Sequence, residues 1–205
     1  MTRTKRKAKI IISIIIAAVV IPLAIYTISP LFLSNVVNEP DPTLAISEFQ
    51  KYMNLSEEER IEVAKNMTRE KAMMIGIIAA KQKTTVDENV SFPVIEQTPN
   101  NTLTGTFIGI GDGFHKVEGA AKVIPVERGS QILRLENFKA TNGPDLYVYL
   151  SKDKSASDFI NVGRLKGNVG NQNYEIPIGS DLSKYNTVLI WCRAFSFLFG
   201  SAQIS

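Results

Sequence analysis

VLIWCRAFSFLFG, from Val188 to Gly200, is the stretch that decides the fold, and it holds the only cysteine and the only tryptophan of the chain. In its first part, TVLIWC (residues 187–192), both alternating sets of side chains are apolar. Successive side chains of a β-strand point to opposite faces of the sheet. Because both sets are apolar, the stretch predicts a strand covered on both sides, in the middle of a sheet.

Three further segments place apolar side chains at every second position: Gln131–Phe138, Asp145–Ser151 and Asn173–Ile178. Short strands separated by Gly, Asn and Pro turns are typical of an antiparallel sandwich or barrel. About 100 residues suffice to bury one core without disulfides. We therefore predict a mainly β chain, with an antiparallel sandwich or barrel over residues 103–205.

The N-terminal segment has the composition of a membrane anchor. Residues 1–9 contain five basic side chains and no acidic one, and the nineteen residues from Ile10 to Ile28 are almost all apolar. At about 1.5 Å per residue, such a helix comes close to the roughly 30 Å hydrocarbon core of a bilayer. We predict a cytoplasmic basic tail at 1–9 and a transmembrane signal-anchor helix at 10–33.

The charges beside this run predict its orientation. The flank before it is basic, and NEPDP (Asn38–Pro42) after it is acidic. By the positive-inside rule the N-terminus is cytoplasmic and the rest lies outside, as in a single-pass protein of the plasma membrane. The alternative is a cleaved signal peptide, but the run exceeds the usual core of about 7–15 residues and no clear small-x-small cleavage site follows.

Residues 34–102 predict an extracytoplasmic stalk that is partly helical. A capping box that begins at Ser56 and the helical spacing of apolar residues predict a helix over about 56–83. Its apolar part, Ala72–Ala80, is too short to cross a membrane, so we expect it to pack against the outer domain, the bilayer surface or another copy of the chain. Residues 84–102 have the composition of a linker.

Two further observations bear on the partners of the chain. The region after residue 103 has eleven basic and nine acidic residues and no basic stripe, which excludes a nucleic-acid binder. The Asn-x-Ser/Thr acceptors that an exposed stalk would present for glycosylation all precede this region: Asn54, Asn66, Asn89 and Asn100.

Three blocks occur in order: FKATNGPDLYVYLS (Phe138–Ser151), VGRLKGNVGNQNYEIP (Val162–Pro177) and VLIWCRAFSFLFGSAQI (Val188–Ile204). Together with HKVEGAAKV upstream of them, they resemble the DM-thirteen domain, also described as an electron-transfer domain and related to the DOMON sandwiches. The resemblance covers residues 103–205. It implies a β-sandwich with one signature cysteine, here Cys192, which acts in redox chemistry as a bare thiol or by holding a prosthetic group such as haem.

The residues themselves leave two interpretations of Cys192 open. Outside the cytoplasm a lone cysteine is either buried and inert or used between molecules. Its alternation with Val188 and Ile190 predicts a side chain that faces the core, where a raised pKa suppresses the thiolate. Arg193 follows directly, but adjacent strand residues point to opposite faces, so we do not expect it to stabilise a thiolate.

His115 is the only histidine of the chain, and we interpret it either as a turn residue after GDGF or as a ligand. Residues 103–205 contain no methionine and no Cys-x-x-Cys-His, which excludes a Met/His-ligated or covalently attached haem within them. The ligands that remain for haem or a soft metal such as copper are Cys192 and His115, provided that the fold brings them together. The glycines of GRLKGNVGNQ lack a phosphate-loop pattern and predict turns.

No serine–histidine–aspartate spacing or carboxylate pair indicates a stand-alone enzyme, and Asp145 in NGPD is interpreted as capping a turn. The first functional hypothesis is a membrane-anchored extracytoplasmic redox or electron-transfer module centred on Cys192, working beside other envelope redox or surface proteins. The second is a cell-surface binding or adhesion sandwich, in which Cys192 is only structural.

Overall fold

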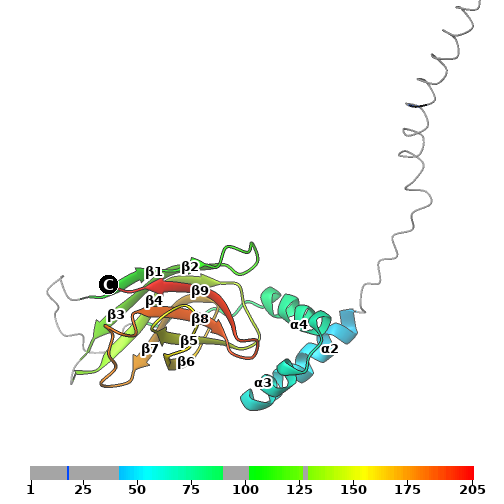
Figure 1. Cartoon of the computed structure of the whole chain (residues 1–205), viewed down its shortest axis with the longest axis horizontal. Helices are drawn as coiled ribbons and strands as arrows, with labels where there is room; N and C mark the ends of the chain where they lie inside the picture. Colours follow the sequence, from blue (N-terminus) through cyan, green and yellow to red (C-terminus); the bar gives the residue numbers. More distant parts are fainter. Residues whose placement is uncertain (1–17, 19–41, 90–101, 127–128) are drawn as a thin grey trace, which may run out of the picture. The chain divides into compact units, whose positions relative to one another are not determined.

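The two sheets of a β-sandwich dominate the structure, a computed structural model that describes residues 18, 42–89, 102–126 and 129–205 (Figure 1). The strands are β1 (Thr104–Thr106), β2 (Ile108–Gly109), β3 (Val117–Pro125), β4 (Gln131–Ala140), β5 (Leu146–Ser151), β6 (Phe159–Arg164), β7 (Val169–Ile176), β8 (Thr187–Cys192) and β9 (Phe197–Gln203). Within residues 42–89 three helices precede them: α2 (Pro42–Met53), α3 (Glu57–Lys65) and α4 (Arg69–Lys81).

All strand pairs within the two sheets are antiparallel. One sheet has the order β1-β3-β4-β7 and the other β2-β9-β8-β5-β6. β8 lies between β9 and β5, with Leu146 opposite Cys192 and Val148 opposite Ile190. The predicted sandwich and the predicted central strand are therefore confirmed.

The main core lies between the sheets, and it is built by the alternation that the sequence shows. Leu133 and Leu135 of β4 face Val148 of β5 and Ile190 of β8 in one buried cluster, and Cys192 belongs to it. The opposite faces of β5 and β8 are also covered. There Tyr147, Tyr149 and Leu189 form a second cluster, and the ring of Phe159 stacks on Tyr149 with centroids 4.1 Å apart.

The helical region differs from the single helix expected over 56–83. The capping box at Ser56 is present, with the Ser56 side chain accepting from the Glu59 N–H and the Glu59 side chain accepting from the Ser56 N–H. However, α3 ends at Lys65, and a second cap at Thr68 begins α4. The Thr68 hydroxyl accepts from the N–H of Lys71. A side-chain cap fixes a helix start, so the second cap divides the expected helix.

The helices pack on the sandwich and do not form a separate stalk. Phe49 and Tyr52 of α2 and Ile75 and Ala79 of α4 form a buried cluster with Ala194, which follows β8. Of the three partners considered for the apolar stretch of α4, the outer domain is the one that Ile75 and Ala79 contact. In line with this, the chain from residue 41 onward clusters as one unit.

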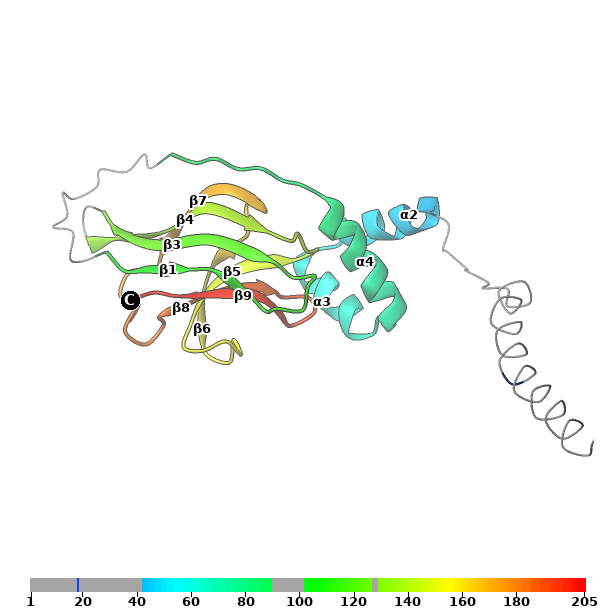
Figure 2. The same cartoon turned by 90° about the horizontal axis from the view of Figure 1, so that it is seen from above.

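The segment after α4, expected as a linker, begins by running along the edge of β7 (Figure 2). The N–H of Val86 donates to the Val169 carbonyl at 2.9 Å, and the Val169 N–H donates to the Thr84 carbonyl at 3.2 Å. The N–H of Glu88 continues the pattern to Asn171 at 2.9 Å. The linker expectation is therefore wrong for residues 84–89, because these bonds tie them to the sheet.

Gly170 is required by this close approach and not by a turn. It lies inside β7 with φ +112°, and a Cβ there would come within 1.8 Å of the Val86 carbonyl oxygen. The sequence predicted turns between strands for the glycine-rich stretch 163–172. In the structure, its Gly170 leaves room for the neighbouring segment that contains Val86.

The expected anchor at 10–33 lies outside the described residues, apart from residue 18. Within the described ranges, no helix combines the length and the apolar character needed to cross a bilayer.

Gly170→Ala should lower the free energy of unfolding by about 2–5 kcal/mol, because the methyl group meets backbone at an unfavourable φ. Urea unfolding of the full chain measures this. Gly179→Ala is the matched control: φ is +84° there, but nothing lies within 4 Å of the Cβ position, so we expect a loss of about 1–2 kcal/mol. Equal losses at the two positions would contradict the close-approach argument.

Candidate functional site

A cavity of about 200 Å³ lies where α4 and the turn before β9 meet one end of the sandwich. It contains the only cysteine and the only histidine of the chain. Its lining residues are Gly76, Phe114, His115, Asn142, Gly143, Pro144, Cys192, Phe195, Phe197 and Phe199. The structure thus brings together the two residues that the sequence singled out, although 77 positions separate them.

Cys192 lies at the end of β8 and is 1% exposed. Burial raises the pKa of its thiol to about 11, and nearby backbone N–H groups, first that of Phe195, offset only part of this effect. At neutral pH the thiol is therefore protonated, and the expectation of a core-facing cysteine with a suppressed thiolate is met. Alternation alone does not reveal that Cys192 is also one of the residues that line the cavity.

His115 is held in one orientation by Asp112 in the GDGF turn. Asp112 Oδ1 accepts from the backbone N–H of His115 at 2.7 Å. The other carboxylate oxygen, Oδ2, lies 2.5 Å from His115 Nδ1. This hydrogen bond with His115 holds the pKa of Asp112 below its usual range. The ring also packs on Phe199 and Phe197, with centroids 4.3 and 4.8 Å away. His115 is therefore both a turn residue and part of the cavity wall.

The lining residues do not fit a haem. Pockets for cofactors and drug-sized ligands measure about 300–1,000 Å³, and this cavity is smaller. A metal ion would find only Cys192 and His115 as strong donors on the wall. Across the part of the chain that the structure describes, no three His, Cys, Asp or Glu side chains gather as a metal centre requires. The chemistry that these residues supply is that of a thiol beside an imidazole.

Ion pairs around Asp145 hold the helical wall against the sandwich. Arg60 Nη2 of α3 donates to Asp145 Oδ1 at 3.2 Å, and the two side chains are 4% and 0% exposed. Arg193 Nε lies 3.6 Å from Asp145 Oδ2, and Arg193 Nη2 donates to Glu57 at 2.8 Å. The Arg193 guanidinium also lies over the Tyr147 ring, so it sits on the face away from the thiol, as predicted.

The role expected for Asp145 needs correction. The turn at NGPD is present, but the Asp145 side chain pairs with Arg60 instead of capping the turn. A buried carboxylate requires a charged or hydrogen-bonding partner, and here a helix supplies it. The sequence does not predict the role of Arg60, because its partner Asp145 lies 85 positions away.

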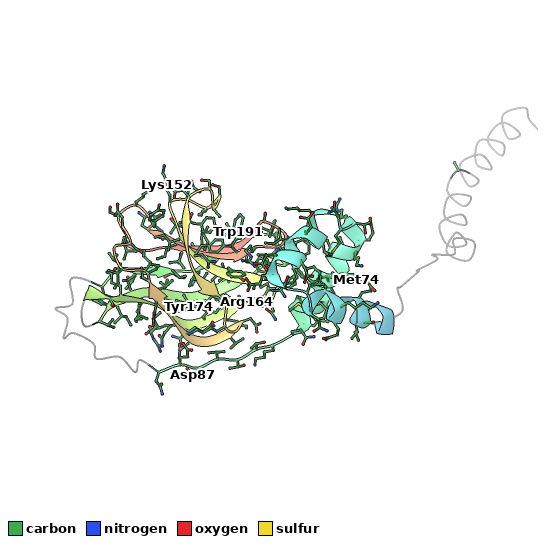
Figure 3. All side chains as sticks on the ribbon, turned by 90° about the horizontal axis from the view of Figure 1, so that it is seen from below. Met74, Asp87, Lys152, Arg164, Tyr174 and Trp191 are labelled. Carbon is green, nitrogen blue, oxygen red and sulfur yellow. The ribbon has the colours of Figure 1, made fainter. Side chains whose placement is uncertain are left out.

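A larger groove of about 630 Å³ lies between β6 and β7, where Arg164 and Tyr174 are found (Figure 3). Neither Cys192 nor His115 lines it. Lys166 on its wall is already paired with Glu88 at 2.8 Å. Tyr174, on the same wall, is almost fully buried. The groove therefore lacks the reactive groups of the smaller cavity.

The predicted glycosylation acceptors lie away from both cavity walls or at their margins. Asn54 and Asn66 are exposed at the ends of α2 and α3. Asn89 is exposed at the margin of the groove. Asn100 lies outside the described residues. Their use as acceptors stays a prediction.

Comparison with protein families identifies the domain that contains both residues. Residues 109–204 match the family model described as electron transfer DM13, a span that includes both His115 and Cys192. No curated protein and no solved structure matches the chain.

Arg60→Met should lower the free energy of unfolding by about 3–5 kcal/mol, because it leaves the Asp145 carboxylate buried without its closest partner. Lys65→Met on the same helix removes the exposed pair with Glu62 and should cost less than about 1 kcal/mol. Urea unfolding of the full chain compares the two. If both variants unfold like the parent, the buried pair does not hold α3 in place.

Proposed function

Residues 109–204 match the DM-thirteen family, and we propose from this premise that the chain is a membrane-anchored extracytoplasmic redox module centred on Cys192. The family is described as one of electron transfer, which supports a redox role. The remaining parts of the proposal, the centre and the anchor, rest on the residues of this chain.

The observation that carries the centre is the shared cavity of Cys192 and His115. They are the only titratable side chains among its lining residues. His115 Nδ1 is engaged by Asp112, which leaves Nε2 as the ring atom that can accept a proton. Phenylalanine rings line the cavity around the two groups, and burial of Cys192 favours the protonated thiol.

The proposed chemistry is thiol–disulfide exchange with a disulfide slender enough to enter the cavity. The Cys192 thiol loses its proton to His115, and its sulfur bonds to one sulfur of the partner. The partner's S–S bond breaks, and its second sulfur leaves as a thiolate that takes up a proton. Only thiolate reacts, so a thiol with a pKa of about 11 stays largely unreactive at neutral pH until a partner is positioned beside it.

The N-terminal sequence supports the anchor. Five basic residues precede the apolar run Ile10–Ile28, and an acidic flank follows it. This arrangement favours a cytoplasmic N-terminus and an outer location for the redox domain, next to other envelope redox proteins.

The anchor proposal predicts an uncleaved chain. Protein extracted from membranes should retain residues 1–33, because the apolar run spans the bilayer and is not removed as a signal peptide. Peptide mapping by mass spectrometry reads the N-terminus directly. A mature protein that begins beyond Leu31 would overturn the anchor and leave the redox proposal untouched.

The thiol proposal predicts a distinctive pH dependence. The chain has one cysteine, so cystamine forms a mixed disulfide at Cys192 alone. In the folded full chain the rate should rise about tenfold per pH unit from pH 7 to 10, because the thiolate fraction grows up to a pKa of about 11. In urea the rate should be higher at pH 7 and level off above about pH 9, near the ordinary pKa of a thiol.

The assay measures the gain in protein mass when the mixed disulfide forms. Cys192→Ser is the negative control and should gain no mass. A folded rate that levels off as in urea shows that the reaction passes through unfolded protein and refutes exchange in the native cavity. In that case the binding or adhesion interpretation, with Cys192 only structural, replaces the redox module.

A further inference from the structure

The cavity beside Cys192 has the size of a site for one small ring. Its volume of about 200 Å³ exceeds the roughly 150 Å³ of an apolar cavity known to take up benzene. It is smaller than the about 300–1,000 Å³ typical of sites for larger ligands. Size therefore selects a single ring with one or two substituents.

The walls favour an aromatic ring. Four phenylalanines, at positions 114, 195, 197 and 199, line the cavity together with the imidazole of His115. Phe114 and Phe199 are both edge-on to His115, with centroids 4.9 and 4.3 Å from it. Aromatic rings prefer such edge-to-face and offset arrangements at centroid distances of about 4.5–7 Å, so a further ring placed here gains contacts that a saturated ring lacks.

Two side chains on this apolar wall can bond a ligand. Asn142 is partly engaged, because its Oδ1 accepts from the N–H of Gly143 and one Nδ2 hydrogen points to the carbonyl of Gln82 at 3.5 Å. His115 Nδ1 is engaged by Asp112, and within the described residues no hydrogen bond to Nε2 is found. A ligand hydroxyl would therefore find an acceptor in the imidazole that Asp112 orients.

Gly76 forms the α4 side of the cavity. No close contact in the structure requires a residue without a side chain at this position. A glycine inside a helix costs about 1 kcal/mol relative to alanine. A Cβ at Gly76 would have nothing within 4 Å, so no close contact requires glycine. Met73 and Ile77, which lie on the same face of α4 by helical spacing, are exposed, as are Phe114 and Phe197. Gly76 thus leaves open space where the cavity meets an apolar rim.

We propose that this cavity binds a single-ring phenol, with the ring among the phenylalanines and the hydroxyl donating to His115 Nε2. The entrance lies beside Gly76. The site goes beyond the proposed redox role, because binding depends on shape and on His115 and not on oxidation of Cys192.

The test uses the full chain in lipid nanodiscs and 4-fluorophenol as the probe, with ¹⁹F NMR to follow binding. Fluorobenzene, which lacks the hydroxyl, should bind several-fold more weakly, and His115→Ala should remove this difference. Gly76→Trp, whose side chain fills the entrance, should weaken 4-fluorophenol binding at least tenfold. Glu70→Trp, at an exposed position in the first turn of α4 and away from the lining residues, is the control and should bind like the parent.

The variants and empty nanodiscs also serve as controls for partitioning of the probe into lipid and for misfolding of the protein. Signal that persists in Gly76→Trp, or that equals that of empty nanodiscs, overturns the proposal. If Gly76→Trp fails to fold, Gly76→Leu replaces it, with circular dichroism as the check. The rate of mixed-disulfide formation with cystamine tests the redox proposal and ¹⁹F NMR tests the phenol site, so a failure of one and a failure of the other give different results.

Discussion

The ion pair between Arg60 and Asp145 is the constraint on which the rest of the site depends. A carboxylate that is fully buried at the start of β5 destabilises the fold unless a charge meets it, and the partner is on a helix outside the sandwich. The pair therefore holds α3 against the sandwich. Once α3 docks, the cluster around Ile75 and Ala194 seats α4 beside the turn that follows β8. The cavity exists only because α4 is there to close it.

The central strands could be predicted from the sequence because their determinants are local. The double apolar alternation of residues 187–192 predicts a covered strand wherever the chain places it, and the capping box at Ser56 likewise needs only its own turn. The resemblance to the DM-thirteen family then predicted that these strands form a β-sandwich. The candidate site was predictable in part: Cys192 and His115 were singled out by being unique, while their shared wall depends on strand register.

What the sequence did not reveal is set by contacts between distant segments. Nothing near Arg60 indicates its partner, and nothing near Gly170 indicates that Val86 passes over it. Such glycines look like turn glycines, because both situations require a residue without a Cβ. The segment 84–89 looked like a linker because it bonds to β7 mainly through its backbone, which leaves little trace in the side chains.

The pairing of residues 84–89 with β7 also changes where this domain begins. The family match starts at residue 109, but the edge of β7 is covered by chain that precedes it, and Gly76 completes the cavity. A fragment limited to the matched span would expose an unpaired strand edge, which invites pairing with other copies, and would leave Asp145 without Arg60. The cooperative unit is therefore longer than the family's span, and helices α2 to α4 belong to it.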